Sequence, residues 1–227
     1  SWTQTDVSLP GNFALEVAVK RELLDAGSWP RATRELGNWN LAIPHIRSRY
    51  ITNVDGSFSH TQGSLPPAWV RGEACSAPLN SNPDFYKYID GAGFELKKED
   101  YWQGDTISIP GVGSEQILQD GTTKKTVNQW KIDCLDVNGV DAFQVTLPDG
   151  TAYIFSELKT IKSFKKTYLA SEDMPCLQQC AYPALGDNTP NLKLAMSVVN
   201  VFMQVTEVKD RFGNWVKYDY DTYGNLI

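Results

Sequence analysis

The last eighteen residues of the chain, 210–227, carry the feature that most constrains its fold. Two short units, Phe212-Gly213-Asn214 and Tyr223-Gly224-Asn225, lie eleven residues apart, and each places an aromatic residue before Gly-Asn. Gly-Asn accepts the positive φ that a tight turn needs, and a strand-like run, residues 215–220, separates the two units. The sequence therefore predicts a repeated hairpin-plus-strand unit.

The composition of the whole chain also favours strands. The 227 residues include 17 Gly, 12 Pro, 10 Tyr and 7 Trp, and 41% of them are hydrophobic. Aromatic side chains suit a pleated surface, Gly and Pro suit turns, and this hydrophobic content is enough for a folded core. We expect a mainly β fold of antiparallel strands and hairpins with little helix.

Turn signals bound most of the expected strands. In the most definite hairpin, Pro148-Asp149-Gly150 joins the runs 143–147 and 151–155. A helix over residues 14–24 is the alternative to the first strand, although Val17 and Val19 favour the strand. Long loops are expected at 64–83, anchored by Trp69, Val70 and Cys75, and at 171–190. The other expected strands are 13–20, 41–46 as interrupted by Pro44, 48–58 with a turn at Asp55-Gly56, 94–97, 106–109, 126–135 and 192–208.

The net charge of −6 argues against a nucleic-acid or anionic-membrane surface, since both need concentrated Lys and Arg. The one basic run, residues 158–166, interleaves Lys with apolar residues, which is typical of a solvated strand edge or turn. Eighteen apolar residues never follow one another, so we expect no membrane span. The first ten residues lack the features of a signal peptide, which leaves export undecided.

The four cysteines form an even set: Cys75, Cys134, Cys176 and Cys180. The short spacing of Cys176 and Cys180 makes them a candidate disulfide in an oxidising compartment. A zinc site is the alternative, but neither His lies near a Cys in the sequence. For Cys75 and Cys134, free buried thiols stay an open interpretation, because an unpaired Cys packs as a small hydrophobe.

Patterns that carry catalysis are weak throughout. No GxSxG elbow occurs, and Ser57 and Ser59 precede His60 in a turn, where sequence neighbours rarely form a triad. Gly111-Val112-Gly113 lacks the residues that complete a phosphate-binding loop. The adjacent carboxylates Glu99 and Asp100 would point to opposite faces of a strand. We expect no catalytic or cofactor-binding residues and no enzyme.

One acidic cluster surrounds Gly139 and could supply oxygen ligands to calcium: Asp133, Asp136, Asn138 and Asp141. Its spacing fails the EF-hand pattern, which needs a Glu at the twelfth position. An ordinary Asn-Gly hairpin explains the cluster better. His45, after Pro44 in an apolar run, is interpreted as a hydrogen-bonded core or packing histidine. We assign no metal-ligating residue.

The C-terminal motif resembles the YD repeat of the RHS family. Residues 147–155 look like that family's recurrent strand-Asp-Gly-strand hairpin, and residues 6–23 and 37–46 are similar to the segment that opens such shells. Residues 60–140 match no motif of the family. The residues that carry the repeat resemblance are Asp210, Gly213, Asn214, Tyr218, Tyr220, Asp221, Gly224, Asn225 and Leu226.

The resemblance implies a long curved β sheet that spirals into a cocoon around a toxic C-terminal polypeptide, for delivery to other cells. Residues 1–200 would be an N-terminal shell segment and 201–227 the start of the repeats. We expect a secreted or cell-surface piece of a longer chain. Its partners would be the remainder of that chain and the delivery-machinery proteins, with no nucleic acid. The family's self-cleavage and toxicity are not carried over, because no residue here matches those segments.

Two other functions are weighed against the shell. An extracellular module could bind carbohydrate or protein through tryptophans, and the candidates are Trp39, Trp69, Trp102 and Trp130. A hydrolase would need an acid–base pair that the sequence does not show.

Overall fold

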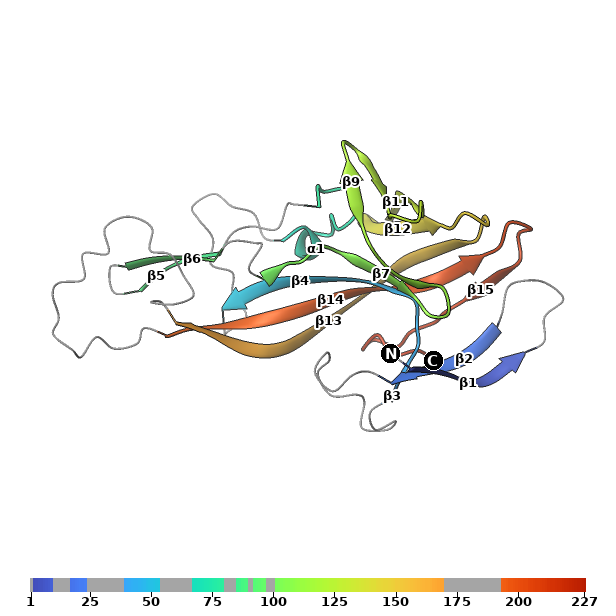
Figure 1. Ribbon diagram of the computed structural model, residues 1–227, viewed down its shortest axis with the longest axis horizontal. Coiled ribbons are helices and arrows are strands. Elements are labelled where there is room, and N and C mark those ends of the chain that lie inside the picture. Colours follow the sequence, from blue (N-terminus) through green and yellow to red (C-terminus); the bar gives the residue numbers. More distant parts are fainter. Residues whose placement is uncertain are drawn as a thin grey trace.

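A computed structural model describes residues 2–9, 17–23, 39–53, 67–79, 85–89, 92–96, 101–169 and 193–227. It confirms a mainly β fold of antiparallel strands with little helix (Figure 1).

The largest sheet has ten strands and is strongly curved. Its order is β8-β7-β4-β14-β13-β12-β11-β10-β9, and β15 pairs with β14 beyond the end of β4. The long antiparallel ribbon of β13 and β14 runs through its middle (Figure 1). The strands are β4 (His45–Asn53), β7 (Thr106–Ile109), β8 (Gly113–Gln116), β9 (Leu118–Asp120), β10 (Thr123–Lys125), β11 (Lys131–Val137), β12 (Val140–Thr146), β13 (Ala152–Leu169), β14 (Lys193–Lys209) and β15 (Trp215–Lys217).

Two smaller sheets and one short helix complete the described fold. The helix alternative for the first expected strand is wrong over residues 17–23, which form the middle strand of a three-stranded antiparallel sheet. Pro44 separates two strands as expected. The elements are the three-stranded sheet β1 (Trp2–Leu9), β2 (Val17–Leu23) and β3 (Trp39–Leu41), the pair β5 (Phe85–Ile89) and β6 (Ala92–Leu96), and α1 (Ala68–Arg71).

The core lies against one face of the large sheet. Phe143, Val145, Phe155 and Val205 are all 0% exposed within it. On β14 every side chain from 196 to 203 is buried, so both faces of this strand are covered. This continuous burial explains why residues 192–208 lack an alternating pattern, and it confirms the expected buried strand.

Several hairpins follow the sequence expectations. Residues 147–151 join β12 to β13, and the N–H of Leu147 donates to the carbonyl of Thr151 (2.8 Å). Asn138 and Gly139 both have positive φ, 56° and 81°, which makes the two-residue turn between β11 and β12. Of the two interpretations of the acidic cluster, the Asn-Gly hairpin is therefore the one that the structure confirms.

Three expected segments are shifted or longer. The strand expected at 126–135 begins only at Lys131, because residues 126–130 form a turn in which Gln129 has a φ of 64°. The strand expected at 151–155 continues to Leu169, because β14 pairs along its whole length. β12 pairs with only the first four residues of β13. The basic run 158–166 therefore pairs with β14 alone among the described strands, as a strand edge should.

The described part of the expected 64–83 loop, residues 67–79, is named the strap here. It contains α1, and it packs inward rather than running over the surface. Trp69 is 4% exposed and stacks on Phe143, with ring centroids 5.8 Å apart. Cys75 is 0% exposed, whereas Val70 is 45% exposed and is not an anchor.

Some predictions fall outside the described residues. These are the start of the first strand, the turn at Asp55-Gly56, the turn containing Ser57, Ser59 and His60, the pair Glu99 and Asp100, and the loop 171–190 with Cys176 and Cys180.

Candidate functional site

The first loop, residues 210–214, is organised by the carboxylate of Asp210. Its Oδ1 accepts hydrogen bonds from the N–H groups of Phe212 and Asn214, both at 2.9 Å, and its Oδ2 accepts one from Nδ2 of Asn214 at 2.7 Å. The N–H of Gly213 donates to the carbonyl of Asp210 at 3.1 Å. Gly213 has a φ of 89°, a conformation that costs glycine little.

The second loop, residues 221–225, repeats this arrangement. Oδ1 of Asp221 accepts from the N–H groups of Tyr223 and Asn225, both at 2.8 Å, and Oδ2 accepts from Nδ2 of Asn225 at 3.0 Å. The N–H of Gly224 donates to the carbonyl of Asp221 at 2.9 Å. Each bond has its counterpart eleven residues earlier, so the sequence repeat is also a repeat of structure.

The strand pairs that close the two loops repeat as well. Lys209 pairs with Trp215 across the first loop, and Tyr220 bridges to Leu226 across the second. Both pairs are offset by the same eleven residues. The segment between the loops therefore serves as the outgoing strand of one hairpin and the incoming strand of the next.

Hydrogen bonding to the two carboxylates favours their charged forms. For Asp210, the bond from the Asn214 side chain contributes most to lowering the pKa, and backbone N–H groups add to it. For Asp221, the N–H of Asn225 contributes most to lowering the pKa, followed by the Asn225 side chain. Both loops consequently hold a negative charge inside a ring of donors.

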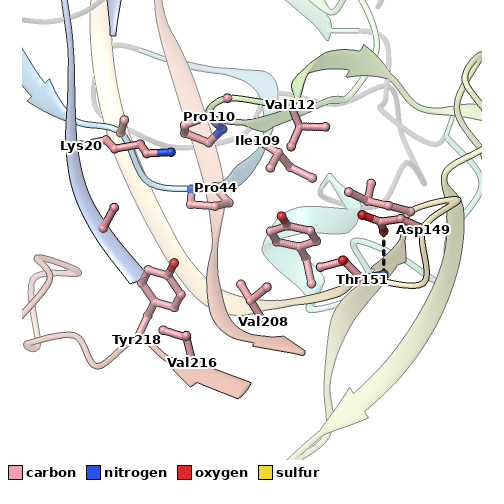
Figure 2. Close-up of a pocket in the computed structure, with 15 residues that line it drawn as sticks. Lys20, Pro44, Ile109, Pro110, Val112, Asp149, Thr151, Val208, Val216 and Tyr218 are labelled. Atoms are coloured by element: carbon pink, nitrogen blue, oxygen red, sulfur yellow. Dashed lines mark hydrogen bonds between the residues drawn. The ribbon is translucent and has the colours of Figure 1, made fainter. Parts of the chain in front are cut away.

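The two predicted tyrosines have separate roles. The Tyr220 hydroxyl donates to the carbonyl of Val205 at 2.5 Å, which ties the tail to β14. Tyr218 packs against the core and lines a pocket of about 260 Å³ (Figure 2). Its wall comes from β2, from the residues before β4, from the tips of the β7–β8 and β12–β13 hairpins, and from β14 and β15.

The pocket wall combines apolar side chains with polar groups, and the polar groups supply the larger part of its surface. Burial raises the pKa of Tyr153 to about 12, with smaller effects of Tyr218 and Asp149, and burial also raises the pKa of Tyr218. Two neutral phenols at neutral pH are hydrogen-bonding groups rather than bases. The carboxylate of Asp149 accepts from the N–H of Thr151 at 2.8 Å (Figure 2). This arrangement suits binding or packing and offers no activated nucleophile.

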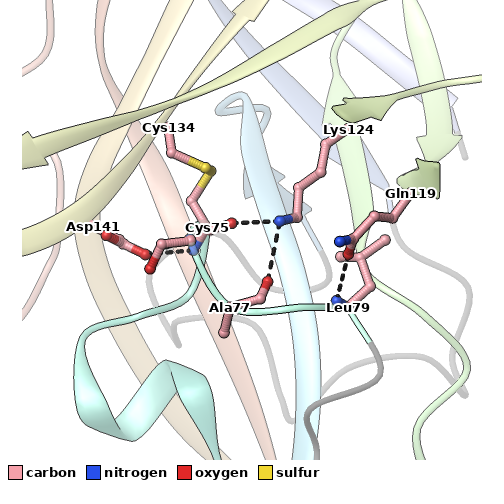
Figure 3. Close-up of a disulfide and its surroundings, with 8 residues drawn as sticks. Cys75, Ala77, Leu79, Gln119, Lys124, Cys134 and Asp141 are labelled. Carbon is pink, nitrogen blue, oxygen red and sulfur yellow. Dashed lines mark hydrogen bonds between the residues drawn. A yellow bond between two sulfur atoms is a disulfide. The ribbon is translucent and has the colours of Figure 1, made fainter. Parts of the chain in front are cut away.

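A disulfide joins the strap to β11. Cys75 and Cys134 are bonded, with their Cα atoms 5.4 Å apart (Figure 3). The free-thiol interpretation of these two residues is therefore wrong. Their Cβ positions meet only because the strap folds back over the sheet, and a separation of 59 residues gives no local sign of this. The even number of cysteines was the one available signal.

Two buried or half-buried charges hold the strap beside the disulfide (Figure 3). Oδ2 of Asp141 accepts from the N–H groups of Cys75 at 3.0 Å and Ser76 at 2.5 Å. Nζ of Lys124, a residue only 4% exposed, donates to the carbonyls of Cys75 at 2.6 Å and Ala77 at 3.1 Å. Burial lowers the pKa of Lys124, and the carboxylates of Asp141 and Asp105 oppose that effect. Sequence reasoning missed Lys124 and considered Asp141 only as a possible calcium ligand, because the partners of both are backbone atoms in a distant segment.

The tryptophans do not gather into one binding face. Trp69 and Trp130 are each 4% exposed and belong to the core, so their side chains are not available to contact a ligand. The Trp102 indole N–H donates to Asp105 Oδ1 at 2.9 Å and to Ser48 Oγ at 3.2 Å. Trp39 lies beneath the guanidinium of Arg21, 5.3 Å from its ring centre.

His45 is a half-buried, hydrogen-bonded histidine, which agrees with the expected hydrogen bonding and packing but not with a place in the core. Its Nδ1 lies 2.9 Å from the carbonyl of Ile43, and its ring meets the edge of Phe202 at 5.5 Å. Burial lowers its pKa, so the neutral imidazole is favoured.

Within the described ranges, no group of three or more His, Cys, Asp or Glu side chains could hold a metal ion. No helix in those ranges has the length and apolar character to span a bilayer. No protein-family model matches the chain, and no curated protein or solved structure shows significant similarity to it.

Proposed function

We propose that the chain is a wall segment of an RHS-type β shell that encloses a polypeptide belonging to the same longer protein. One observation carries the proposal: two loops with the same hydrogen bonds recur at the eleven-residue spacing of the YD-like motif. A wall made of repeats needs such a unit, because each hairpin must present the next strand in the same register.

The way the tail continues the large sheet supports a wall. β4 pairs with β14 as far as the partners His45 and Gln204. The N–H of Val205 then donates to the carbonyl of Pro44 at 3.0 Å, and the N–H of Tyr218 donates to the carbonyl of Thr206 at 3.0 Å. β15 takes over the same edge from Glu207 onward. Along this edge, the backbone groups of β14 thus pair first with β4 and then with the repeat hairpin. Further repeats could extend the sheet there.

Containment would be the mechanism. A hydrogen-bonded sheet with buried side chains separates its two sides without any catalytic group. The Cys75–Cys134 disulfide supports export, since such bonds persist in oxidising compartments.

Two measurements test the shell. The reading frame beyond Ile227 should encode further Asp-x-aromatic-Gly-Asn repeats and then a variable C-terminal segment. In the full-length protein, that segment should resist protease until denaturant opens the sheet, whereas the same segment expressed alone should be digested at once. A reading frame without further repeats, or equal digestion in both forms, would refute the proposal.

A second candidate is an extracellular binding module. Exposed aromatic side chains on the tail favour it: Phe212 is 63% exposed, Trp215 59% and Tyr223 80%. Aromatic faces of this kind stack on sugars and peptides. Binding of the 227-residue chain on a glycan array, abolished by Trp215→Ala, would support this function over containment.

A further inference from the structure

The two loops share their internal bonds but differ in what lies against them. At the second loop, Nζ of Lys159 from β13 donates to the carbonyl of Gly224 at 3.0 Å and to Oδ1 of Asn225 at 3.1 Å. The charge of Lys159 also contributes to the lowered pKa of Asp221. We name the Gly carbonyl, the Asn Oδ1 and the Asp carboxylate of a loop its lysine socket.

The chemistry of the socket matches an ammonium group. Lysine carries three N–H donors and no acceptor, and the socket offers two neutral oxygens backed by one negative charge. The alkyl chain of the lysine passes close to the glycine. A Cβ atom at Gly224 would lie 3.2 Å from Cδ and 3.3 Å from Cγ of Lys159. Glycine therefore makes the turn and also leaves the space for the side chain.

The first loop holds the same groups in the same arrangement. Nδ2 of Asn214 is anchored on Oδ2 of Asp210, as Nδ2 of Asn225 is on Asp221, so Oδ1 of the asparagine is left facing away from the carboxylate in both loops. A Cβ atom at Gly213 would meet nothing within 4 Å. Among the described residues, no lysine occupies this socket.

We propose that the first loop is a docking site for a lysine side chain on an extended strand of a partner polypeptide. The filled socket sets the chemistry of this occupant, because Lys159 reaches the second loop from the extended strand β13. The aromatic residue of the motif is not needed for the contact. In the second loop Tyr223 stays 80% exposed although Lys159 is bonded to Gly224 and Asn225. The site does not depend on the shell. Within a shell, the strand would belong to a neighbouring part of the wall.

The test uses the 227-residue chain labelled with ¹⁵N and a peptide probe. The probe is the acetylated and amidated segment 156–161, Ser-Glu-Leu-Lys-Thr-Ile, and the matched control replaces its lysine with uncharged norleucine. We expect the lysine peptide to shift the amide resonances of Gly213 and Asn214 saturably, with a Kd in the millimolar range. At the same peptide concentration, these shifts should be at least about threefold larger than those caused by the norleucine peptide. Gly139 is the internal control, because it is also exposed with positive φ but lies in a loop without the Asp-x-aromatic-Gly-Asn motif.

Two variants separate the socket from general effects. Asn214→Ala removes one socket oxygen and should abolish the shifts at Gly213. Lys159→Met empties the second socket, so the peptide should then also shift Gly224 and Asn225. If the second loop responds in Lys159→Met while the first loop never responds, the first loop is not a docking site. Equal effects of the lysine and norleucine peptides, or equal shifts at Gly139, would also overturn the proposal.

Discussion

The strap and the tail, residues 210–227, both lie against the large sheet, but contacts of opposite range hold them. The strap depends on partners far away in the sequence. Its bonds to Gln119, Lys124 and Asp141 span 40 to 66 residues, and its disulfide spans 59. The loops of the tail depend mainly on bonds inside each loop, where Asp210 and Asp221 reach no further than four residues. The longer contacts of the tail are few, and that of Lys159 with the second loop is the longest described.

This difference decides how changes in the two regions should affect the stability of the protein. The place of the strap depends on the assembled sheet, because its partners come from β9, β10, β11 and β12. Each tail loop needs only its own five residues to make most of its bonds. Changes in the strap should therefore act on global stability, and changes in a loop should act locally.

The largest effect is expected from removing the disulfide. In Cys75→Ser/Cys134→Ser, loss of a cross-link that closes a loop of 59 residues should lower the free energy of unfolding by ~4 kcal/mol. Urea denaturation followed by tryptophan fluorescence measures this, because Trp69 lies in the strap. The amide resonances of the two tail loops serve as the control and should keep their positions. A loss below ~1 kcal/mol would show that the polar contacts alone hold the strap.

The next effect concerns Lys124. Lys124→Met keeps the alkyl volume but leaves the carbonyls of Cys75 and Ala77 without their donor, which should cost about 1–3 kcal/mol. Lys125→Met is the matched control on the same strand, and its effect should stay within about 0.5 kcal/mol. Equal losses in the two variants, measured by the same urea titration, would contradict the role of Lys124.

The same difference between local and distant contacts decides which parts of the structure the sequence predicts well. The tail's turns could be predicted because Gly, Asn and the carboxylates act on neighbouring residues at fixed offsets. The 147–151 hairpin was predictable for the same reason. The strap could not be predicted, because Lys124 and Asp141 bind backbone atoms of residues whose positions only the fold decides. Nothing near Cys75 indicates Cys134 as its partner, and four cysteines allow three pairings.

The length of β13 shows an intermediate case. Its first residues, 152–155, are an apolar run directly after the Pro148-Asp149-Gly150 turn, so this part of the strand was predicted. The extension through 158–169 depends on β14 offering a partner of equal length. The basic run 158–166 was interpreted as a strand edge or turn, and among the described strands it pairs with β14 alone; Lys159 was not recognised as a ligand of the second loop. Its contact with Gly224 spans 65 residues.

A smaller, local effect is expected from the loop carboxylates. Asp210→Ala and Asp221→Ala should each speed amide exchange within the altered loop several-fold, because three donors lose their acceptor. The folded pKa of both carboxylates is lowered, so their stabilisation is complete above the unfolded pKa of about 3.9. It is lost as the pH falls through the folded pKa.

Wild-type loops should accordingly begin to exchange faster only below about pH 3.9, whereas each Ala variant should show no such acid step in its own loop. Hydrogen exchange read by NMR between pH 2 and 6 distinguishes the two. Asp221→Asn is the conservative control, since it keeps one acceptor oxygen and removes the charge. If a change at Asp221 opened the strap as well, the locality of the tail would be refuted.

The smallest effect should come from Lys159→Met. Its two hydrogen bonds are partly exposed to solvent, so their loss should cost less than ~1 kcal/mol of global stability. Exchange at Gly224 and Asn225 should nevertheless rise, while exchange at Gly213 and Asn214 stays unchanged, because Lys159 contacts only the second loop. Lys217→Met, an exposed lysine of β15, is the control and should leave both loops as they are. A response of both loops to Lys159→Met would show that the tail moves as one unit, and its two hairpins would then have to be treated as a single cooperative element.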